Sequence, residues 1–202
     1  MPQAALSDTI AEVVFYLVVT AWWLSFVVTY FVGRRAGEKG DAKRDVISTL
    51  GMLLQMSSYV IVFALSRKYF SPFLPMSKLA EIILGVFAVL LAAGSAWLCF
   101  AAARALGKQW ALMARVIEGH ELITSGPYAA VRNPIYLAIL MTLIACGLAA
   151  STWQGLLVAI VVCLAGTWIR IRSEEKLLRE AFGAKFEDYA RRVPALLPRL
   201  LR

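Results

Sequence analysis

Apolar residues of this chain occur in long uncharged runs, and the charged residues gather in the segments between them. Residues 13–32 and 46–65 are uncharged runs of 20 residues each, and residues 82–103 form a run of 22. A helix rises about 1.5 Å per residue, so each run is long enough to cross the roughly 30 Å hydrocarbon core of a bilayer. The pattern predicts three membrane-spanning helices, at about residues 7–32, 46–66 and 79–104.

A fourth uncharged run, residues 133–169, has 37 residues and is too long for one crossing. It breaks naturally near residues 149–154, which predicts two helices at about residues 134–150 and 153–171. The chain is 60% hydrophobic with a mean hydropathy of +0.71, above the composition of soluble domains. We therefore predict an all-α polytopic membrane protein with about five transmembrane helices, forming a single integral membrane domain over residues 1–202.

Lysine and arginine residues are divided unequally between the two sides of these crossings. Segments 33–45 and 104–132, together with the tail from Arg170, hold 18 of the 21, and segment 66–78 holds three. The positive-inside rule then places the N-terminus outside, and the long loop and the C-terminal tail in the cytoplasm. The net charge of +8 suits anionic membrane lipids, and no spaced aromatic–basic motif predicts nucleic-acid binding. The first apolar run lacks a basic leader and a cleavage site, so we expect a retained helix.

Polar residues inside the predicted helices are few. Gln55, Ser57 and Ser58 are expected to form interhelical hydrogen bonds. The three cysteines have no paired spacing and are expected to be small buried apolar residues. With a single histidine in the chain, they do not supply a ligand cluster, so no metal site is expected.

The most polar and turn-rich stretch is GHELITSGPYAAVRNPIY, residues 119–136. It contains the only histidine, His120, and a Ser-Gly-Pro turn, and Gly and Pro at this density fix a backbone path. Pro134 suits the first turn of the helix that follows. We interpret this loop as a cofactor site at a membrane surface, held in place by the membrane helices.

The tail from Arg170 is a second polar unit, and we assign the cofactor region to residues 105–136 and 170–198. Arg170 and Glu174 lie four residues apart and share one face of a helix. Taken alone, this pair also fits a salt bridge at a membrane boundary. Leu178, Phe182, Phe186, Tyr189 and Val193 then recur at helical spacing, which predicts an amphipathic C-terminal helix that lies on the membrane or covers the loop.

Taken together, the two polar units resemble a known family. The loop motif HELITSGPYAAVRNPIY, an uncharged helical hairpin, and RIRSEEKLLREAFGAKFEDYARRVPALLP are similar to the isoprenylcysteine carboxyl methyltransferases and phospholipid methyltransferases. The resemblance covers about residues 108–198. It implies a methyl transfer that depends on S-adenosylmethionine, with S-adenosylhomocysteine as product, in or beside the cytoplasmic face of the membrane.

The resemblance also implies roles for particular residues. Arg170 would bind the acceptor's carboxylate and serve as the catalytic residue, and Glu174 would bind the cofactor's ammonium. The remaining cofactor-binding residues would be His120, Glu121, Leu122, Ile123, Tyr128, Asn133, Pro134, Ile135 and Tyr136. A carboxylate acceptor is already ionised near neutral pH and needs no base, whereas an amine acceptor would make Glu175 the candidate base.

This sequence departs from the family's motifs at two positions that bear on the identity of the substrate. Asn133 stands where the family's carboxyl methyltransferases usually have histidine, so a hydrogen-bonding role at this position survives and an acid–base role does not. The Gly-x-Gly element of the phospholipid enzymes is also absent after Tyr136, which disfavours phosphatidylethanolamine. We therefore expect carboxyl O-methylation of an isoprenylcysteine-like or other lipophilic acid that enters between helices. The alternatives are a phospholipid amine N-methyltransferase, an NADPH-dependent sterol-type reductase and a non-catalytic membrane scaffold.

Overall fold

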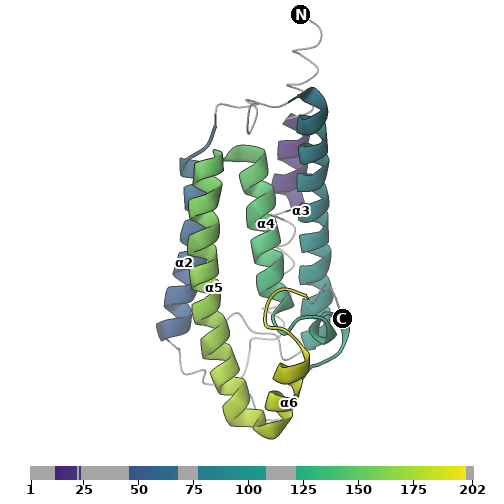
Figure 1. Cartoon of the computed structure of the whole chain (residues 1–202), viewed down its shortest axis with the longest axis vertical. Coiled ribbons are helices and arrows are strands. Elements are labelled where there is room, and N and C mark those ends of the chain that lie inside the picture. The colour runs from purple at the N-terminus through teal and green to yellow at the C-terminus, as the bar shows by residue number, and fades with distance from the viewer. Residues whose placement is uncertain (1–11, 22, 24–45, 68–76, 108–121, 199–202) are drawn as a thin grey trace, which may run out of the picture.

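The protein is a bundle of helices in the computed structural model, which describes residues 12–21, 23, 46–67, 77–107 and 122–198 (Figure 1). Its elements are the apolar helix Glu12–Ala21, α2 (Val46–Ala64), α3 (Lys78–Leu106), η2 (Gly126–Ala129), α4 (Pro134–Ala150), α5 (Trp153–Phe182) and α6 (Ala184–Arg192). Over these residues no strand is present beyond a single bridge between Ser66 and Ser151. The predicted all-α class is confirmed.

Three of the helices are long and apolar enough to cross a membrane, namely α2 over Ile47–Ala64, α3 and α5. Two shorter apolar helices, Glu12–Ala21 and α4, stand beside them in the bundle (Figure 1). The 17 residues of α4 are at the lower limit of about 17 for a crossing. The structure therefore supplies three full-length spans, and the prediction of five rests on these two shorter helices as well.

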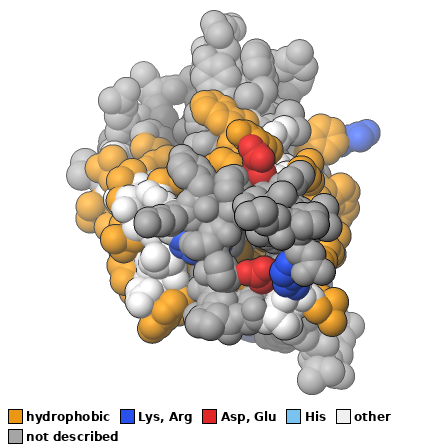
Figure 2. Space-filling model, turned by 90° about the horizontal axis from the view of Figure 1, so that it is seen from above, with side chains coloured by type: hydrophobic (Ala, Val, Ile, Leu, Met, Phe, Trp, Pro, Cys, Tyr) orange, Lys and Arg blue, Asp and Glu red, His pale blue; other side chains and the backbone are white. Residues whose placement is uncertain are grey.

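The outer wall of the bundle is apolar. On α3 the exposed fractions of Leu79, Leu90 and Trp97 are 68%, 64% and 67%. Seen from above, apolar side chains make up most of the described perimeter (Figure 2). Soluble monomers rarely leave so much contiguous apolar surface in water, so this wall faces lipid. The chain is an integral membrane protein.

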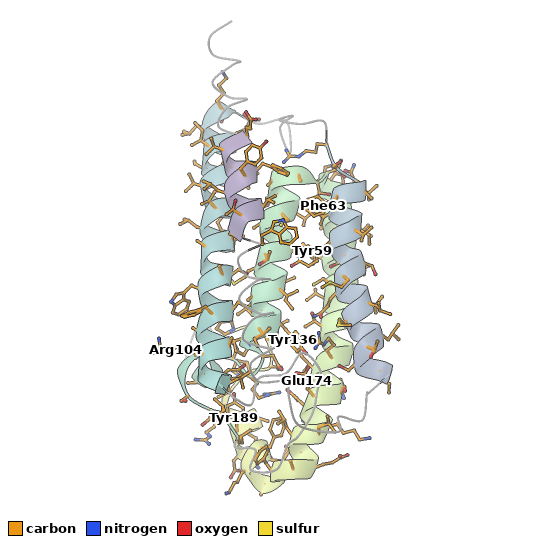
Figure 3. All side chains as sticks on the ribbon, turned by 180° about the vertical axis from the view of Figure 1, so that it is seen from behind. Tyr59, Phe63, Arg104, Tyr136, Glu174 and Tyr189 are labelled. Carbon is orange, nitrogen blue, oxygen red and sulfur yellow. The ribbon has the colours of Figure 1, made fainter. Side chains whose placement is uncertain are left out.

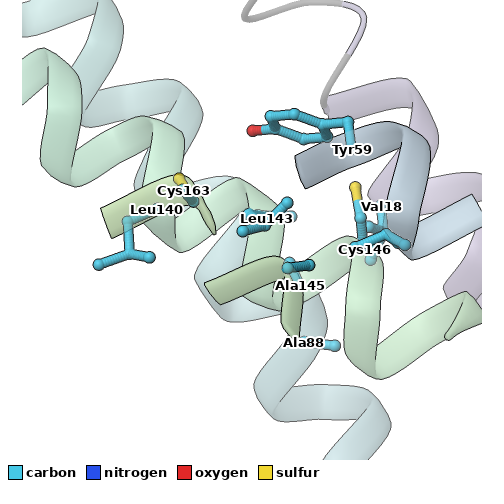
Figure 4. Close-up of a cluster of buried hydrophobic side chains, with 11 residues drawn as sticks. Val18, Tyr59, Ala88, Leu140, Leu143, Ala145, Cys146 and Cys163 are labelled. Atoms are coloured by element: carbon cyan, nitrogen blue, oxygen red, sulfur yellow. The ribbon is translucent and has the colours of Figure 1, made fainter. Parts of the chain in front are cut away.

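Four of the helices associate as two pairs, with α2 along α5 and α3 along α4. Contacts between α4 and α5 join the pairs, and the core lies between them (Figure 4). Its buried residues include Tyr59, Leu143, Cys146 and Cys163, and all three cysteines of the chain are buried, as predicted. At the α3–α4 contact the buried Ser95 hydroxyl donates to the carbonyl of Ala138 at 2.8 Å.

The two glycines at the α2–α5 contact bring these helices close together. A Cβ atom at Gly166 would lie 2.6 Å from the carbonyl oxygen of Gly51 and 2.9 Å from the Cβ atom of Leu54. Contacts this short with backbone and a helix-borne Cβ leave no room for a side chain. The close approach fixes how the polar half of α5 is placed relative to α2.

Replacing Gly166 with alanine is therefore expected to destabilise the protein by about 1–3 kcal/mol, because the added methyl group overpacks this contact. Gly94→Ala on α3 is the matched control, since its Cβ atom would meet only the flexible tip of Met141, at 3.2 Å. Thermal unfolding in detergent should show a lower Tm for Gly166→Ala and an unchanged or higher Tm for Gly94→Ala. Equal Tm values for the two variants would contradict the close contact.

Polar residues of α2 differ in their roles. Gln55 forms the predicted interhelical hydrogen bond, from its Nε2 to Oγ1 of Thr167 at 2.8 Å. The prediction is wrong for Ser57, whose hydroxyl donates at 2.6 Å to a carbonyl of its own helix. The Ser58 hydroxyl also donates within α2 at 2.6 Å, but its side chain forms the predicted interhelical hydrogen bond as well, with Cys163 of α5. A serine hydroxyl reaches the preceding turn more easily than it reaches a neighbouring helix.

The C-terminal tail is built differently from the prediction. The helix predicted at about residues 153–171 is longer in the structure, because α5 continues without a break to Phe182. Gly183 then adopts a φ of 50°, a conformation that favours glycine, and α6 starts in a new direction (Figure 1). The expected single amphipathic stripe is thus divided between two helices, and α6 turns Phe186 and Tyr189 inward.

Candidate active site

Three polar segments meet at the lower end of the bundle in Figure 1: the loop around η2, the start of α4, and the polar half of α5. Pro134 occupies the first turn of α4 as predicted, and its ring pre-sets the helical backbone there. The loop reaches this turn through η2, whose Tyr128 is buried and which packs against α3. This arrangement places Tyr136 on the first turns of α4, facing α5.

A cluster of three side chains, Tyr136, Arg170 and Glu174, joins α4 to α5; we call it the α4–α5 cluster. The Tyr136 hydroxyl donates to Oε1 of Glu174, and Nη2 of Arg170 lies 3.5 Å from the same oxygen. The Arg170 guanidinium also lies 5.0 Å from the centre of the Tyr136 ring. Figure 3 shows Tyr136 and Glu174 next to each other at this end of the bundle.

Burial differs within the cluster. Tyr136 and Arg170 are only 5% and 8% exposed, whereas the Glu174 side chain keeps 27% of its surface accessible. A partly accessible carboxylate beside two buried partners offers an anchoring point for a cation. The neighbouring guanidinium offers a fork of donors suited to a carboxylate.

A second group of charged residues lies beside the first; Arg132, Glu175 and Arg179 form what we call the tail clamp. Arg132 donates through Nε to Oε1 of Glu175 at 2.9 Å, with its Nη2 at 2.8 Å from the same oxygen, and Arg179 pairs with Oε2 at 3.2 Å. Nη1 of Arg132 donates to the carbonyls of Ala190 and Val193. The clamp thus ties the loop before α4 to α5 and to the end of α6.

The chain after α6 is hydrogen-bonded along the same loop. The backbone N–H groups of Arg132 and Asn133 donate to the carbonyls of Pro194 and Ala195 at 2.9 and 3.1 Å. Nδ2 of Asn133 also donates to the carbonyl of Ala195, at 2.9 Å. Asn133 therefore uses its side-chain amide to hold the tail in place.

Helix α6 is docked onto η2. The Tyr189 hydroxyl donates to the backbone carbonyl of Tyr128 at 2.7 Å, and Phe186 is 1% exposed. Burial, with a smaller effect from the Glu174 carboxylate, raises the pKa of Tyr128 above its ordinary value. Burial also raises the pKa of Tyr189 to about 12, with Arg132 opposing the shift and Glu175 adding to it.

The docking of α6 is expected to weaken in alkali. An unfolded tyrosine titrates near pH 10, so a folded pKa of about 12 means that the Tyr189 hydroxyl contributes stability below pH 10 and loses it as the pH rises toward 12. The stability difference between the wild type and Tyr189→Phe should therefore be constant up to about pH 9 and then shrink. Proteolysis of α6 over this pH range measures it, and a difference that grows with pH would contradict the assignment.

The structure brings together some of the residues predicted for the site. Tyr136, Arg170 and Glu174 are in contact, and the Glu174 charge also acts on Tyr128. Half-buried Leu122 and Ile123 precede η2, while buried Pro134 and half-buried Ile135 open α4. His120 and Glu121 lie outside the described residues, so their predicted roles stay predictions.

Sequence reasoning missed two residues of this region. Arg132, which precedes Asn133 and Pro134, was assigned no role in the prediction. In the structure it is the centre of the tail clamp. Gln55, predicted to form an interhelical hydrogen bond but not to belong to the site, also accepts a hydrogen bond from Nη1 of Arg170 at 3.3 Å. The signal was present in the second case, because a glutamine within an apolar helix requires a polar partner.

The chemistry of the described residues fits S-adenosylmethionine. Glu174 supplies a partly exposed carboxylate for an ammonium group, Tyr136 is hydrogen-bonded to it, and Tyr128 is close enough for the charge of Glu174 to act on it. Leu122 and Ile123 add apolar surface on the same loop. Within the described part of the chain, no group of three or more His, Cys, Asp or Glu side chains is placed to hold a metal ion.

The fold and this polar end define an integral membrane protein whose helical bundle carries a charged site at one end. Residues 83–185, which include α4, α5 and nearly all of α3, match the family model described as "Phospholipid methyltransferase". The chain belongs to the phospholipid methyltransferase family, as its resemblance indicated. Helix α2, with Gln55, lies outside the matched residues.

Two curated relatives are similar to part of the chain. The "Cobalt-zinc-cadmium resistance protein CzcN" of Cupriavidus metallidurans is 39% identical over 99 residues, which cover 47% of this chain and 44% of the relative. The "Nickel-cobalt-cadmium resistance protein NccN" of Alcaligenes xylosoxydans xylosoxydans is 38% identical over 99 residues, covering 47% and 45%. The aligned part of the chain thus spans less than half the length of the curated relatives it matches.

Proposed function

We propose that this protein is a membrane methyltransferase that uses S-adenosylmethionine to methylate the carboxylate of a lipophilic acceptor. The observation that carries the proposal is the α4–α5 cluster, in which a partly exposed carboxylate and a buried guanidinium share one hydrogen-bonded group at the end of an apolar bundle. Membership of the phospholipid methyltransferase family supports the reaction class.

In this proposal Glu174 binds the cofactor's ammonium, and Tyr128, Tyr136, Leu122 and Ile123 border its adenosine. The cofactor, when bound, supplies an electrophilic methyl group on a sulfonium. The protein's own contribution is to orient the acceptor and exclude water from the reacting groups. His120, Glu121, Pro134 and Ile135 complete the proposed cofactor-binding set, and Asn133 acts through the tail segment that it holds over this end.

Arg170 binds the acceptor's carboxylate in the same proposal, because its planar fork matches two carboxylate oxygens. Such an acceptor is ionised near neutral pH, so the reaction needs no general base. Glu175, the base expected for an amine acceptor, is occupied by Arg132 and Arg179 in the tail clamp. The occupation of Glu175 supports a carboxylate over an amine.

The acceptor is also expected to have a long apolar part. The outer wall of the bundle is apolar up to the level of the site: Trp168, just before Arg170 on α5, is 56% exposed. An acceptor dissolved in the membrane would therefore approach the site from the side, between helices. A prenylated cysteine has this combination of a carboxylate and an apolar chain. We place the site on the cytoplasmic side, where the positive-inside rule puts the basic loop and tail.

A phospholipid amine is the second candidate acceptor, and the family match favours it. The two candidates are separated by incubating the purified protein with labelled S-adenosylmethionine and either N-acetyl-S-farnesylcysteine or vesicles that contain phosphatidylethanolamine. We expect a base-labile methyl ester on the first and no methylated headgroup from the second. Methylation of the headgroup alone would replace the carboxylate proposal with the amine one.

A further inference from the structure

We propose that Gln55 of α2 is a positioning residue that aims the Arg170 guanidinium at the acceptor's carboxylate; this inference rests on the proposed function. Gln55 lies outside the residues matched by the family model, on a different helix from the α4–α5 cluster. Its side chain is nonetheless hydrogen-bonded to Arg170. The site is therefore completed from α2.

The Gln55 side chain is buried and is hydrogen-bonded at both ends of its amide. Its side chain is 0% exposed, its Oε1 accepts from Nη1 of Arg170 at 3.3 Å, and its Nε2 donates to Oγ1 of Thr167 at 2.8 Å. Because Thr167 orients the amide, the oxygen is directed toward Arg170. Burying an amide in an apolar helix is costly unless both of its ends are bonded, and here both are.

The backbone of α2 also accommodates the Arg170 side chain. A Cβ atom at Gly51 would lie 2.6 Å from Cγ of Arg170, so the aliphatic stem of the arginine packs directly against this glycine. Helix α2 thus holds both the stem, at Gly51, and the guanidinium, at Gln55. Two separate contacts from one helix restrict Arg170 more than a single hydrogen bond would.

The chemical type of residue 55 matters as much as its position. A glutamine oxygen accepts a hydrogen bond without carrying charge, so it orients the guanidinium and leaves its positive charge available. Glu174 pairs with Arg170 through a full carboxylate. If Glu174 binds a cofactor's ammonium, Gln55 still keeps Arg170 in place, and the positive charge is then free to attract an acceptor's carboxylate.

Gln55→Met tests this role, because methionine preserves the volume and removes the acceptor. We expect the KM for N-acetyl-S-farnesylcysteine to rise by about tenfold or more, consistent with one lost hydrogen bond to a charged group, while S-adenosylhomocysteine affinity stays within about twofold. Thr167→Val removes the other bond of the same amide and should raise KM by about threefold or less. Ser57→Ala on the same helix is the control and should leave KM unchanged, because among the described residues the Ser57 hydroxyl donates within α2.

Gln55→Glu separates orientation from charge. It retains an oxygen facing Arg170 but adds a negative charge, so the KM for the carboxylate should rise as much as in Gln55→Met. A KM near the wild-type value in Gln55→Met would make Gln55 a packing residue. Equal losses of kcat without a change of KM in Gln55→Met and Thr167→Val would lead to the same conclusion. Either result would overturn this inference and leave the proposed function standing. A wild-type protein that binds S-adenosylhomocysteine but methylates no carboxylate would overturn the acceptor proposal together with this inference.

Discussion

Replacing Glu174 with glutamine is expected to weaken S-adenosylhomocysteine binding by about 10- to 100-fold. The substitution keeps the size of the side chain and removes the charge that pairs with the ligand's ammonium, and a hydrogen bond to a charged group contributes about 1.5–3 kcal/mol. Tyr136 and Arg170 both bond to Oε1 of this carboxylate, so the loss also loosens the rest of the α4–α5 cluster. Calorimetric titration of the detergent-purified variants measures the change.

Glu180→Gln is the matched control, because Glu180 is an exposed carboxylate further along α5. Its removal should leave the affinity within about twofold of wild type. Thermal unfolding of both variants separates a loss of binding from a loss of folding. Equal affinities in Glu174→Gln and wild type would remove Glu174 from the cofactor site and would leave the Arg170–Glu174 pair as a salt bridge at a membrane boundary.

Replacing Arg170 with methionine is expected to reduce turnover of a carboxylate acceptor by about 100-fold or more, while S-adenosylhomocysteine binding persists. Truncating one partner of a buried charge pair costs about 2–5 kcal/mol. The loss is expected in the binding and turnover of the acceptor, because Arg170 is the cation proposed to bind it. Without Arg170, the Glu174 carboxylate loses its ion-pair partner on α5. This loss favours the binding of the ligand's ammonium to Glu174. Methyl-ester formation and ligand affinity, measured on the same sample, test the two parts together.

Two further variants sharpen this prediction. Arg172→Met removes an arginine from the outer side of the same helix, where its guanidinium lies 4.5 Å from the centre of the Trp168 ring, and should retain wild-type turnover. Arg170→Lys keeps the charge but has no planar fork, so its turnover should lie between wild type and Arg170→Met. If Arg170→Met and Arg172→Met both turn over the carboxylate at the wild-type rate, Arg170 does not bind the acceptor.

The helices of this fold were predictable because uncharged runs in a membrane protein are long and their ends are marked. The Pro134 start of α4 and the break at residues 151–152 both follow from local signals. The continuation of α5 to Phe182 was not predicted, because the loss of hydropathy at Arg170 marks the end of the apolar segment and not the end of the helix. Gly183, a weak point for a helix within the predicted amphipathic stripe, is where it ends.

The contacts within the candidate site were predictable where its residues lie close in sequence or match the family's motif. Arg170 and Glu174 share a helix face by spacing alone, and the structure adds the hydrogen bond from Tyr136, which the family resemblance had placed in the same site. Two partners of Arg132 could not be predicted, because they are backbone carbonyls of residues 190 and 193, which carry no sequence signature. The link from Arg170 to Gln55 joins positions 115 residues apart and depends on how α2 packs on α5.

The binding of S-adenosylhomocysteine to the wild-type protein in detergent, measured by calorimetry with NADPH titrated in parallel, tests the proposed function most directly. We expect a micromolar dissociation constant for S-adenosylhomocysteine and no heat of binding for NADPH. Binding of NADPH alone would contradict the methyltransferase proposal in favour of a reductase. Binding of neither would contradict it in favour of a non-catalytic scaffold, and the α4–α5 cluster would then be a structural ion pair.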